Sequence, residues 1–198
     1  MDCYIRDKHS TQQVRVPVGK HSYGWEKIIL TYSWLANLKI GNFCALAPGL
    51  TINLGGNHRI DWISTYPFGL PVPPSAQIFK DNVRGRDKLF SISNGDIVIG
   101  NDIWTGFDVT IMSGVKIGDG AVISSNSVVY ESIKPYSIVG GNPAKLWTFR
   151  FDEDIIKKLL EIKWWNWPDK NIYDVVPLLL SSEFNELFEY YESNKQNL

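Results

Sequence analysis

Branched aliphatic and small residues recur every six positions between residues 97 and 133, and this period limits the fold more than any other feature. One register contains Ile99, Thr105, Ile111, Ile117, Ile123 and Val129, and the register two residues earlier contains Ile97, Ile103, Val109, Val115, Ala121, Ser127 and Ile133. An α-helix would need apolar residues three and four positions apart, and a long strand would alternate every two. A period of six predicts a parallel β-helix, in which each hexad forms one short strand and one turn.

Three hexads make one coil of a triangular prism, and the aliphatic residue of each hexad points inward. Gly, Asn and Asp at the corners supply the backbone conformations that the turns need. The same period is present earlier, where Ile40, Leu46 and Ile52 predict one complete coil. A flat sheet with glycine-rich turns is the alternative, but six successive hexads that keep register favour the prism.

Composition places the chain among globular proteins and excludes several partners. The 198 residues are 44% hydrophobic and 21% charged, with a net charge of -1 and a pI near 6.3. This balance argues against nucleic-acid binding, which normally requires a basic surface. The sequence has no apolar run of transmembrane length and no signal-peptide core, so we expect a cytoplasmic chain without membrane insertion. The two cysteines form no metal spacing, and Cys44 falls on an inward hexad position.

Three segments depart from the hexad pattern. Residues 1–15 are polar without a clear period and predict an extended arm. The pattern stops at His58, and residues 59–94 contain prolines and aromatics instead, which predicts a loop that projects from the prism and contacts an acceptor. A purely structural flap is the alternative. We therefore expect a β-helix domain over residues 1–150 with this loop, and a helical appendage over residues 151–198.

The appendage begins after Phe151 with apolar residues at helical spacing. This pattern predicts an amphipathic helix with Asp152 as its N-cap, followed by a second helix from Ile172 to Tyr191. Trp164, Trp165 and Trp167 follow the first helix. They could form an aromatic recognition patch, but packing against the prism or a neighbouring subunit is the favoured interpretation.

Four sequence motifs together resemble a known family. They are GNHRIDWISTYPF at 56–68, IGNDIWTG at 99–106, IVGGNPAK at 138–145 and RFDEDIIKKLLEIKWWNWP at 150–168. The chain resembles the hexapeptide-repeat xenobiotic acetyltransferase family, which includes chloramphenicol and streptogramin acetyltransferases and related sugar O-acetyltransferases. The resemblance implies a left-handed parallel β-helix, a homotrimer with active sites between subunits, acetyl-CoA as donor without a required metal, and a catalytic histidine on the loop.

Acetyl transfer from a thioester to an alcohol needs a base that takes the hydroxyl proton. Imidazole suits this task because its ordinary pKa is about 6.5. By resemblance, His58 is that base, and direct transfer is favoured over an acyl-enzyme because the sequence contains no G-x-S-x-G elbow and Cys44 points inward. Nearby residues are candidates for orienting the imidazole or binding the acceptor, although Asn and Asp also serve turns: Asn57, Asp61, Trp62 and Tyr66.

The resemblance also implies a groove for the donor along the β-helix. Gly106, Ser124 and Ser125 are the expected corners, and Trp104 is expected at the thioester end. The residues expected beside the nucleotide are Asn142, Ala144 and Lys145, with Lys145 and Arg150 as partners for phosphates.

Several functions remain open at this stage. The main hypothesis is an acetyl-CoA-dependent O-acetyltransferase acting on a sugar or a surface-polysaccharide precursor, because the loop is rich in aromatics that can stack on sugar rings. The alternative is an antibiotic O-acetyltransferase for chloramphenicol or a streptogramin. A nucleotide-sugar N-acetyltransferase and a noncatalytic hexapeptide-repeat scaffold are weaker readings. A zinc enzyme would need several histidines grouped around the β-helix, and this sequence has one histidine in a suitable place.

Overall fold

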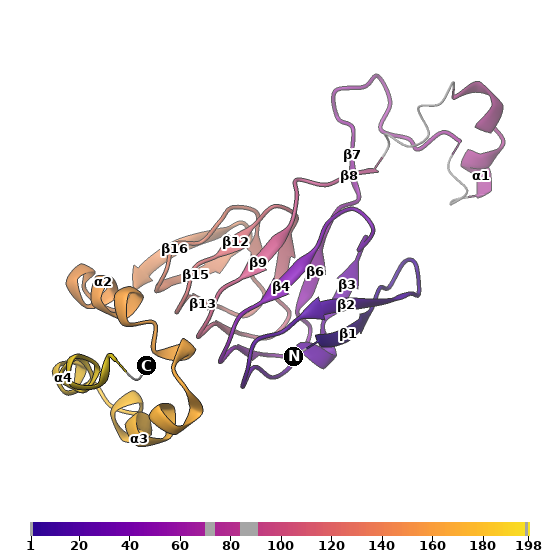
Figure 1. Ribbon diagram of the computed structural model, residues 1–198. Coiled ribbons are helices and arrows are strands. Elements are labelled where there is room, and N and C mark those ends of the chain that lie inside the picture. The colour runs from indigo at the N-terminus through magenta and orange to yellow at the C-terminus, as the bar shows by residue number, and fades with distance from the viewer. Residues whose placement is uncertain (1, 70–73, 84–90, 197) are drawn as a thin grey trace.

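The chain forms a three-sided prism of short strands in the computed structural model, which describes residues 2–69, 74–83, 91–196 and 198 (Figure 1). The first sheet contains β4 (Leu38–Ile40), β9 (Ile97–Ile99) and β12 (Lys116–Ile117). The second contains β5 (Ala45–Leu46), β10 (Trp104–Thr105), β13 (Val122–Ile123), β15 (Ser137–Gly141) and β16 (Ala144–Phe149). The third contains β3 (Ile29–Thr31), β6 (Thr51–Asn53), β11 (Thr110–Met112) and β14 (Val128–Val129).

Successive coils pair in parallel, which confirms the predicted β-helix. Residues 38–54, 97–115 and 116–133 form the first, second and third coils, and neighbouring coils are in register, with Ile40 opposite Ile99 and Ile52 opposite Ile111. Both hexad registers between residues 97 and 133 lie in the core, where every member is at most 9% exposed. The period of six therefore identified the inward side chains correctly.

Two inward positions are polar, and the backbone satisfies both of them. The Thr105 hydroxyl accepts from the Ala47 amide at 3.2 Å. The Ser127 hydroxyl donates to the Ser124 carbonyl at 2.6 Å and accepts from the Gly141 amide at 3.2 Å. Burying a hydroxyl costs little free energy when it has such partners. These two residues therefore link neighbouring coils by hydrogen bonds inside an otherwise aliphatic core.

The N-terminal segment is more regular than predicted. Instead of an extended arm, it forms an antiparallel hairpin of β1 (Asp2–Arg6) and β2 (Gln13–Pro17), and the 3-10 helix η1 (Trp25–Lys27) follows. Cys3, Ile5 and Val16 are buried on the inward side of this hairpin. Because each strand has only five residues, its alternation of apolar and polar residues is too short to be recognised within a polar sequence.

The described residues of the C-terminal appendage form three α-helices and one 3-10 helix. They are α2 (Glu153–Ile162), η4 (Trp164–Asn166), α3 (Asp169–Leu179) and α4 (Phe184–Asn194). Asp152 occupies the predicted N-cap position, although its side chain makes no capping hydrogen bond within the described chain. The single helix predicted from Ile172 to Tyr191 is wrong, because α3 ends at Leu179 and α4 begins at Phe184. Trp165 and Trp167 are buried, which confirms the packing interpretation.

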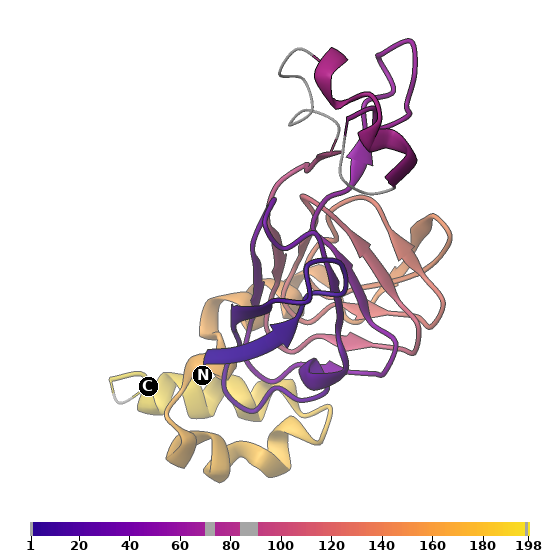
Figure 2. The ribbon, with the colours of Figure 1, turned by 90° about the vertical axis from the view of Figure 1, so that its right-hand side faces the viewer.

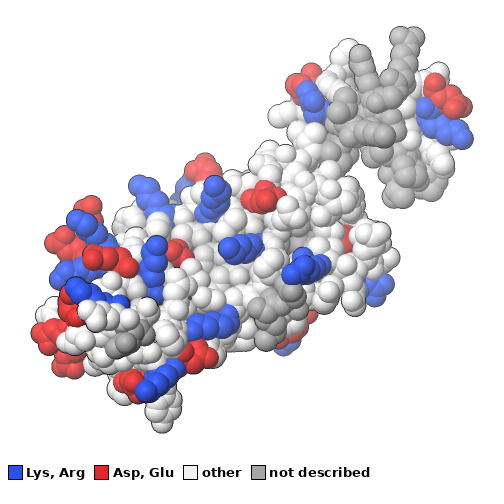
Figure 3. All heavy atoms as spheres, viewed as in Figure 1, with Lys and Arg blue, Asp and Glu red and all other residues white. Residues whose placement is uncertain are grey.

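A second group of elements lies outside the prism, across it from the appendage (Figures 1 and 2). This excursion, defined as the described residues between 57 and 92, contains β7 (Asn57–His58), α1 (Pro74–Gln77), the 3-10 helix η2 (Lys80–Asn82) and β8 (Ser91–Ile92). On the face that Figure 3 shows, basic and acidic side chains are interspersed. Within the described part of the chain, every helix is too short or too polar to cross a membrane.

Candidate active site

His58 lies where the chain leaves the first coil, at the corner between the third and first sheets. Gly56 precedes it with φ 85°, and a Cβ there would overlap the ring of Tyr32. Only glycine combines that backbone conformation with such a close approach. The two residues of β7 then pair antiparallel with β8, which places His58 opposite Ser91. The His58 side chain is exposed.

The imidazole of His58 is held by the backbone of its own excursion. Its Nδ1 atom lies 2.7 Å from the carbonyl oxygen of Thr65. Because a carbonyl can only accept, Nδ1 carries the hydrogen, and the basic lone pair of the neutral ring is on Nε2. The structure therefore supplies an orienting partner for His58 that the sequence did not reveal.

Asn57 connects the start of this excursion to the second coil. Its side-chain amide donates a hydrogen bond to the Ser113 hydroxyl at 3.2 Å, and the same hydroxyl accepts a hydrogen bond from the backbone N–H of Asn94 at 3.1 Å. Ser113 is only 3% exposed. These contacts fix the base of the excursion, and Ser113 joins the candidate site as a residue that the sequence analysis missed.

The remaining predicted acceptor residues belong to the same excursion as His58. Arg59 pairs with Asp61, and its guanidinium lies 5.4 Å from the centre of the Trp62 ring. The hydrogen bond from Arg59 holds the pKa of Asp61 below its ordinary value. Tyr66 packs edge-on against Phe68 with ring centres 4.8 Å apart. The excursion thus presents an aromatic surface, and its contact with an acceptor stays a prediction.

Most of the predicted donor-binding residues share one corner of the prism. We define the Gly106 corner as the residues that occupy equivalent positions between the second and third sheets in successive coils, which are Ala47, Gly106, Ser124 and Gly140. A Cβ at Gly106 would overlap Ser125, and the Ser124 amide donates to the Val139 carbonyl at 2.9 Å. Gly106 itself is buried, whereas Ser125 is exposed.

The chain continues from this corner into the predicted nucleotide-binding residues. Asn142 follows β15 directly, and Ala144 and Lys145 on β16 pair with Gly141 and Gly140. Lys145 is exposed. The structure therefore brings Gly106, Ser124, Ser125, Asn142, Ala144 and Lys145 to one edge of the prism.

A groove of about 490 Å³ lies beside the Gly106 corner. Trp104, which is 57% exposed, lines it together with Phe107, Tyr23 and residues 45–48. Trp104 is thus a wall of this groove rather than a core residue. Phe107 and Tyr23 were missed because they carry no motif and stand outside the inward hexad positions.

Arg150 lies at a different corner, and its guanidinium is already engaged there. It donates to the Asp102 carboxylate at 2.9 Å and to the Gly120 carbonyl at 2.8 Å, between the first and second sheets. It also lies 5.3 Å from the centre of the Tyr136 ring. Burial raises the pKa of Asp102 although Arg150 acts in the opposite direction. These contacts give Arg150 a structural role, and its predicted contact with a phosphate stays a prediction.

Cys44 lies in the prism core, as its hexad position predicted. It is completely buried, and its thiol donates to the Gly100 carbonyl at 3.2 Å. Burial raises the pKa of this thiol to about 11. Since the thiolate is the nucleophilic form of cysteine, Cys44 is a poor candidate for an acyl-enzyme.

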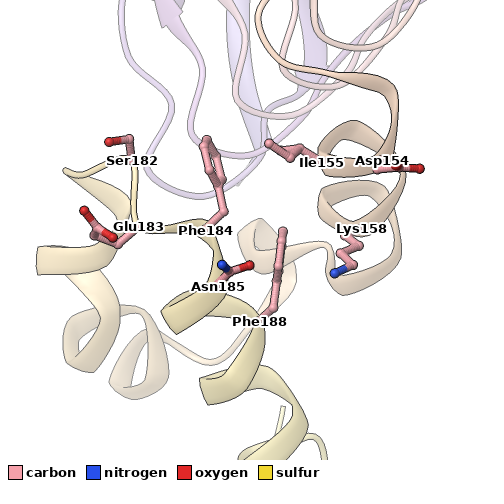
Figure 4. Close-up of a pocket in the computed structure, with 8 residues that line it drawn as sticks. All are labelled: Asp154, Ile155, Lys158, Ser182, Glu183, Phe184, Asn185 and Phe188. Atoms are coloured by element: carbon pink, nitrogen blue, oxygen red, sulfur yellow. The ribbon is translucent and has the colours of Figure 1, made fainter.

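The appendage contains a separate hollow of about 220 Å³ between α2 and α4 (Figure 4). Phe184 and Phe188 line it from α4, and Ile155 and Lys158 line it from α2. The Lys158 ammonium lies 5.0 Å from the centre of the Phe188 ring. This hollow is a seam between packed helices, and it contains none of the predicted site residues.

Comparisons with known proteins identify the family of the chain. Residues 96–131 match the family model described as bacterial transferase hexapeptide (six repeats). The chain is 38% identical to a chloramphenicol acetyltransferase of Agrobacterium fabrum, covering 92% of each protein. It is 43% identical to a probable macrolide acetyltransferase of Lysinibacillus sphaericus, covering 78% of this chain and 83% of the relative.

A solved structure is similar as well. It is a hexapeptide-repeat-containing acetyltransferase of Vibrio cholerae O1 biovar eltor complexed with acetyl-coenzyme A, with 25% identity and a TM-score of 0.51. The match covers 69% of this chain and 61% of that protein. The hexad prism and a relative that is similar along nearly its whole length lead to one conclusion. The chain belongs to the hexapeptide-repeat xenobiotic acetyltransferase family, and it is an acetyltransferase.

Proposed function

We propose that the chain is an acetyl-CoA-dependent O-acetyltransferase whose acceptor is a hydroxyl group of an antibiotic. The Agrobacterium and Lysinibacillus relatives are named for chloramphenicol and macrolide acetylation, and the similar Vibrio structure contains acetyl-coenzyme A. The sequence alone favoured a sugar acceptor. The names of the relatives support the antibiotic alternative better, so a sugar hydroxyl becomes the second candidate.

In this proposal His58 is the general base. Nε2 takes the proton of the acceptor hydroxyl as the oxygen attacks the thioester carbonyl, which forms a tetrahedral intermediate. The intermediate collapses to the acetyl ester and the coenzyme A thiolate, and the imidazolium returns its proton to the thiolate. The contact between Nδ1 and Thr65 carries this proposal, because it leaves Nε2 as the basic atom of an exposed ring.

The Gly106 corner is the proposed binding site of the donor. Its small residues leave room for a thin pantetheine arm beside the groove that Trp104 lines. Lys145, exposed at the far end of this corner, is positioned to pair with the phosphates by charge-assisted hydrogen bonds. Asn142 and Ala144 accompany it.

A homotrimer with active sites between subunits would complete the site. Within one protomer, His58 lies at the corner between the third and first sheets, whereas the Gly106 corner lies between the second and third sheets. The base and the donor corner are therefore on different edges of one prism. We propose that cyclic assembly brings His58 of one subunit to the Gly106 corner of the next, with coils that wind left-handed.

The excursion is the proposed acceptor surface. Trp62 and Tyr66 supply aromatic faces on the excursion that carries His58, and Asn57 and Asp61 supply polar groups on the same excursion. The long loop between two regular coils suits this role, because binding residues are often held on loops by a rigid scaffold.

An acceptor panel tests the proposal. The release of free thiol from acetyl-CoA is measured with chloramphenicol, a streptogramin, a macrolide and several sugars, and the acetylated product is identified by mass spectrometry. We expect turnover with at least one antibiotic. Turnover with sugars alone would establish the second candidate. Absence of turnover with every antibiotic and every sugar would overturn the proposal. Sedimentation velocity tests the trimer, which a monomer at assay concentration would contradict.

A further inference from the structure

Trp147 occupies the end of the Gly106 corner. A Cβ at Gly140 would overlap the six-membered ring of Trp147, so the indole lies directly against the backbone of Gly140. Gly140 is the last member of the corner, in the position equivalent to Ser124 and Gly106. The ring therefore extends the column of small residues by one aromatic layer.

A β-bulge places the indole there. On β16, Leu146 pairs with Val139 and Thr148 pairs with Ile138, so Trp147 is the extra residue in the register shift. A bulge redirects the side chain of the inserted residue and is common next to functional sites. Trp147 remains 61% exposed although one part of its ring rests on Gly140. Packing of the protomer alone does not account for so large an exposed apolar group.

A cation is carried by the residue that pairs with Gly140. Lys145 pairs with Gly140 in the β15 and β16 register, so the ammonium and the indole project from the same end of the corner. An exposed aromatic face stacks on a base, and an ammonium pairs with phosphates. This pair of groups has the chemistry that recognises a purine nucleotide.

We propose that Trp147 is a donor-binding residue that stacks on the adenine ring of acetyl-CoA. The proposal rests on the proposed function, because it takes the Gly106 corner as the site of the donor. It adds that the affinity for the donor depends on the nucleotide through one aromatic contact.

Truncated donors isolate this contact. KM is measured for acetyl-CoA and for S-acetylpantetheine, which lacks the adenine nucleotide, with wild type, Trp147→Ala and Trp147→Phe. Loss of a base stack predicts a rise of about 5- to 150-fold in the KM for acetyl-CoA with Trp147→Ala, and a much smaller rise with Trp147→Phe. The KM for S-acetylpantetheine and the value of kcat should not change. Leu146→Ala is the matched control, because Leu146 is the preceding residue on the same strand and is 52% exposed.

Calorimetry with coenzyme A and with adenosine 3′,5′-bisphosphate separates this proposal from the proposed function, because binding requires neither the acceptor nor His58. Weaker binding of both ligands to Trp147→Ala supports the adenine stack, even if no acceptor turns over. Equal binding of both ligands to wild type and variant would overturn it. A change of sedimentation coefficient in Trp147→Ala with unchanged ligand affinity would also overturn it, by assigning the indole to a subunit contact.

Discussion

His58 and Thr65 form a closed unit within the excursion. The Nδ1 atom donates to the Thr65 carbonyl seven positions later in the chain, at 2.7 Å. The segment that carries the imidazole thus also selects its tautomer, and no side chain is needed for the task. This arrangement resembles the orientation of catalytic and metal-binding histidines by a backbone carbonyl in other proteins.

Replacing His58 should remove catalysis without unfolding the chain. We expect His58→Ala to lower kcat by about 10²- to 10⁴-fold, because a positioned general base contributes that range. The KM for acetyl-CoA should stay nearly constant, since in the proposed site His58 acts on the acceptor hydroxyl, whereas the Gly106 corner and Lys145 hold the donor. Steady-state thiol release measures both values. His21→Ala is the control, because His21 pairs with Asp169 in the appendage. An unchanged kcat in His58→Ala would require another base.

Lys145 and Arg150 should differ in what their loss affects. Arg150→Gln removes the partner of the partly buried Asp102 and should lower the free energy of unfolding by about 1 to 3 kcal/mol. It should leave the KM for acetyl-CoA within about twofold, since Arg150 is outside the Gly106 corner. Lys145→Gln should do the reverse, raising this KM with little loss of stability. Denaturant unfolding and donor titration distinguish the two, and a raised KM in Arg150→Gln with unchanged stability would support the predicted phosphate role instead.

The two polar residues of the prism core should not be equally important. Ser127→Ala leaves the Ser124 carbonyl and the Gly141 amide without their hydroxyl partner and should cost about 1 to 3 kcal/mol of stability. Thr105→Val should cost less, because the Ala47 amide that reaches the Thr105 hydroxyl also donates to the Thr105 carbonyl at 3.3 Å. Thermal unfolding at a fixed protein concentration tests the order. A larger effect of Thr105→Val would contradict it.

Cys44 should be unreactive in the native protein. Its thiol has a pKa of about 11 when folded, against 9.0 ordinarily, so near pH 8 the folded protein contains about 100-fold less thiolate than the unfolded chain. The unfolded thiol loses its proton first as the pH rises, so the stability linked to this group falls between pH 9 and about 11. Thiol labelling against pH, in a Cys3→Ala background, checks the reactivity.

The nucleophile alternative has its own test. Cys44→Ala removes the thiol from a completely buried position, so it should retain turnover at a small cost in stability. Loss of all turnover in a folded Cys44→Ala variant would point to an acyl-enzyme.

Errors in the sequence predictions have identifiable physical causes. The N-terminal hairpin was missed because five residues show too little alternation of apolar and polar side chains. The long second helix is in fact two, because Ser181 and Ser182 interrupt it although helix-forming residues stand on both sides. The structural role of Arg150 was missed for a different reason. Its partner Asp102 is 48 positions away, and no local pattern indicates such a pairing.

The sequence by itself determined the prism, its inward residues and the interruption of the hexad pattern at His58. A period of six requires each aliphatic residue to stack on its equivalent one coil away, and few backbones meet that requirement. Only the tertiary structure decided which nitrogen of His58 is basic, which corner Arg150 occupies and where the Trp147 ring rests. A repeat fixes whether a side chain points into the prism or away from it. The contacts of that side chain depend on a bulge, a turn or another coil, and these contacts form only when the coils pack together.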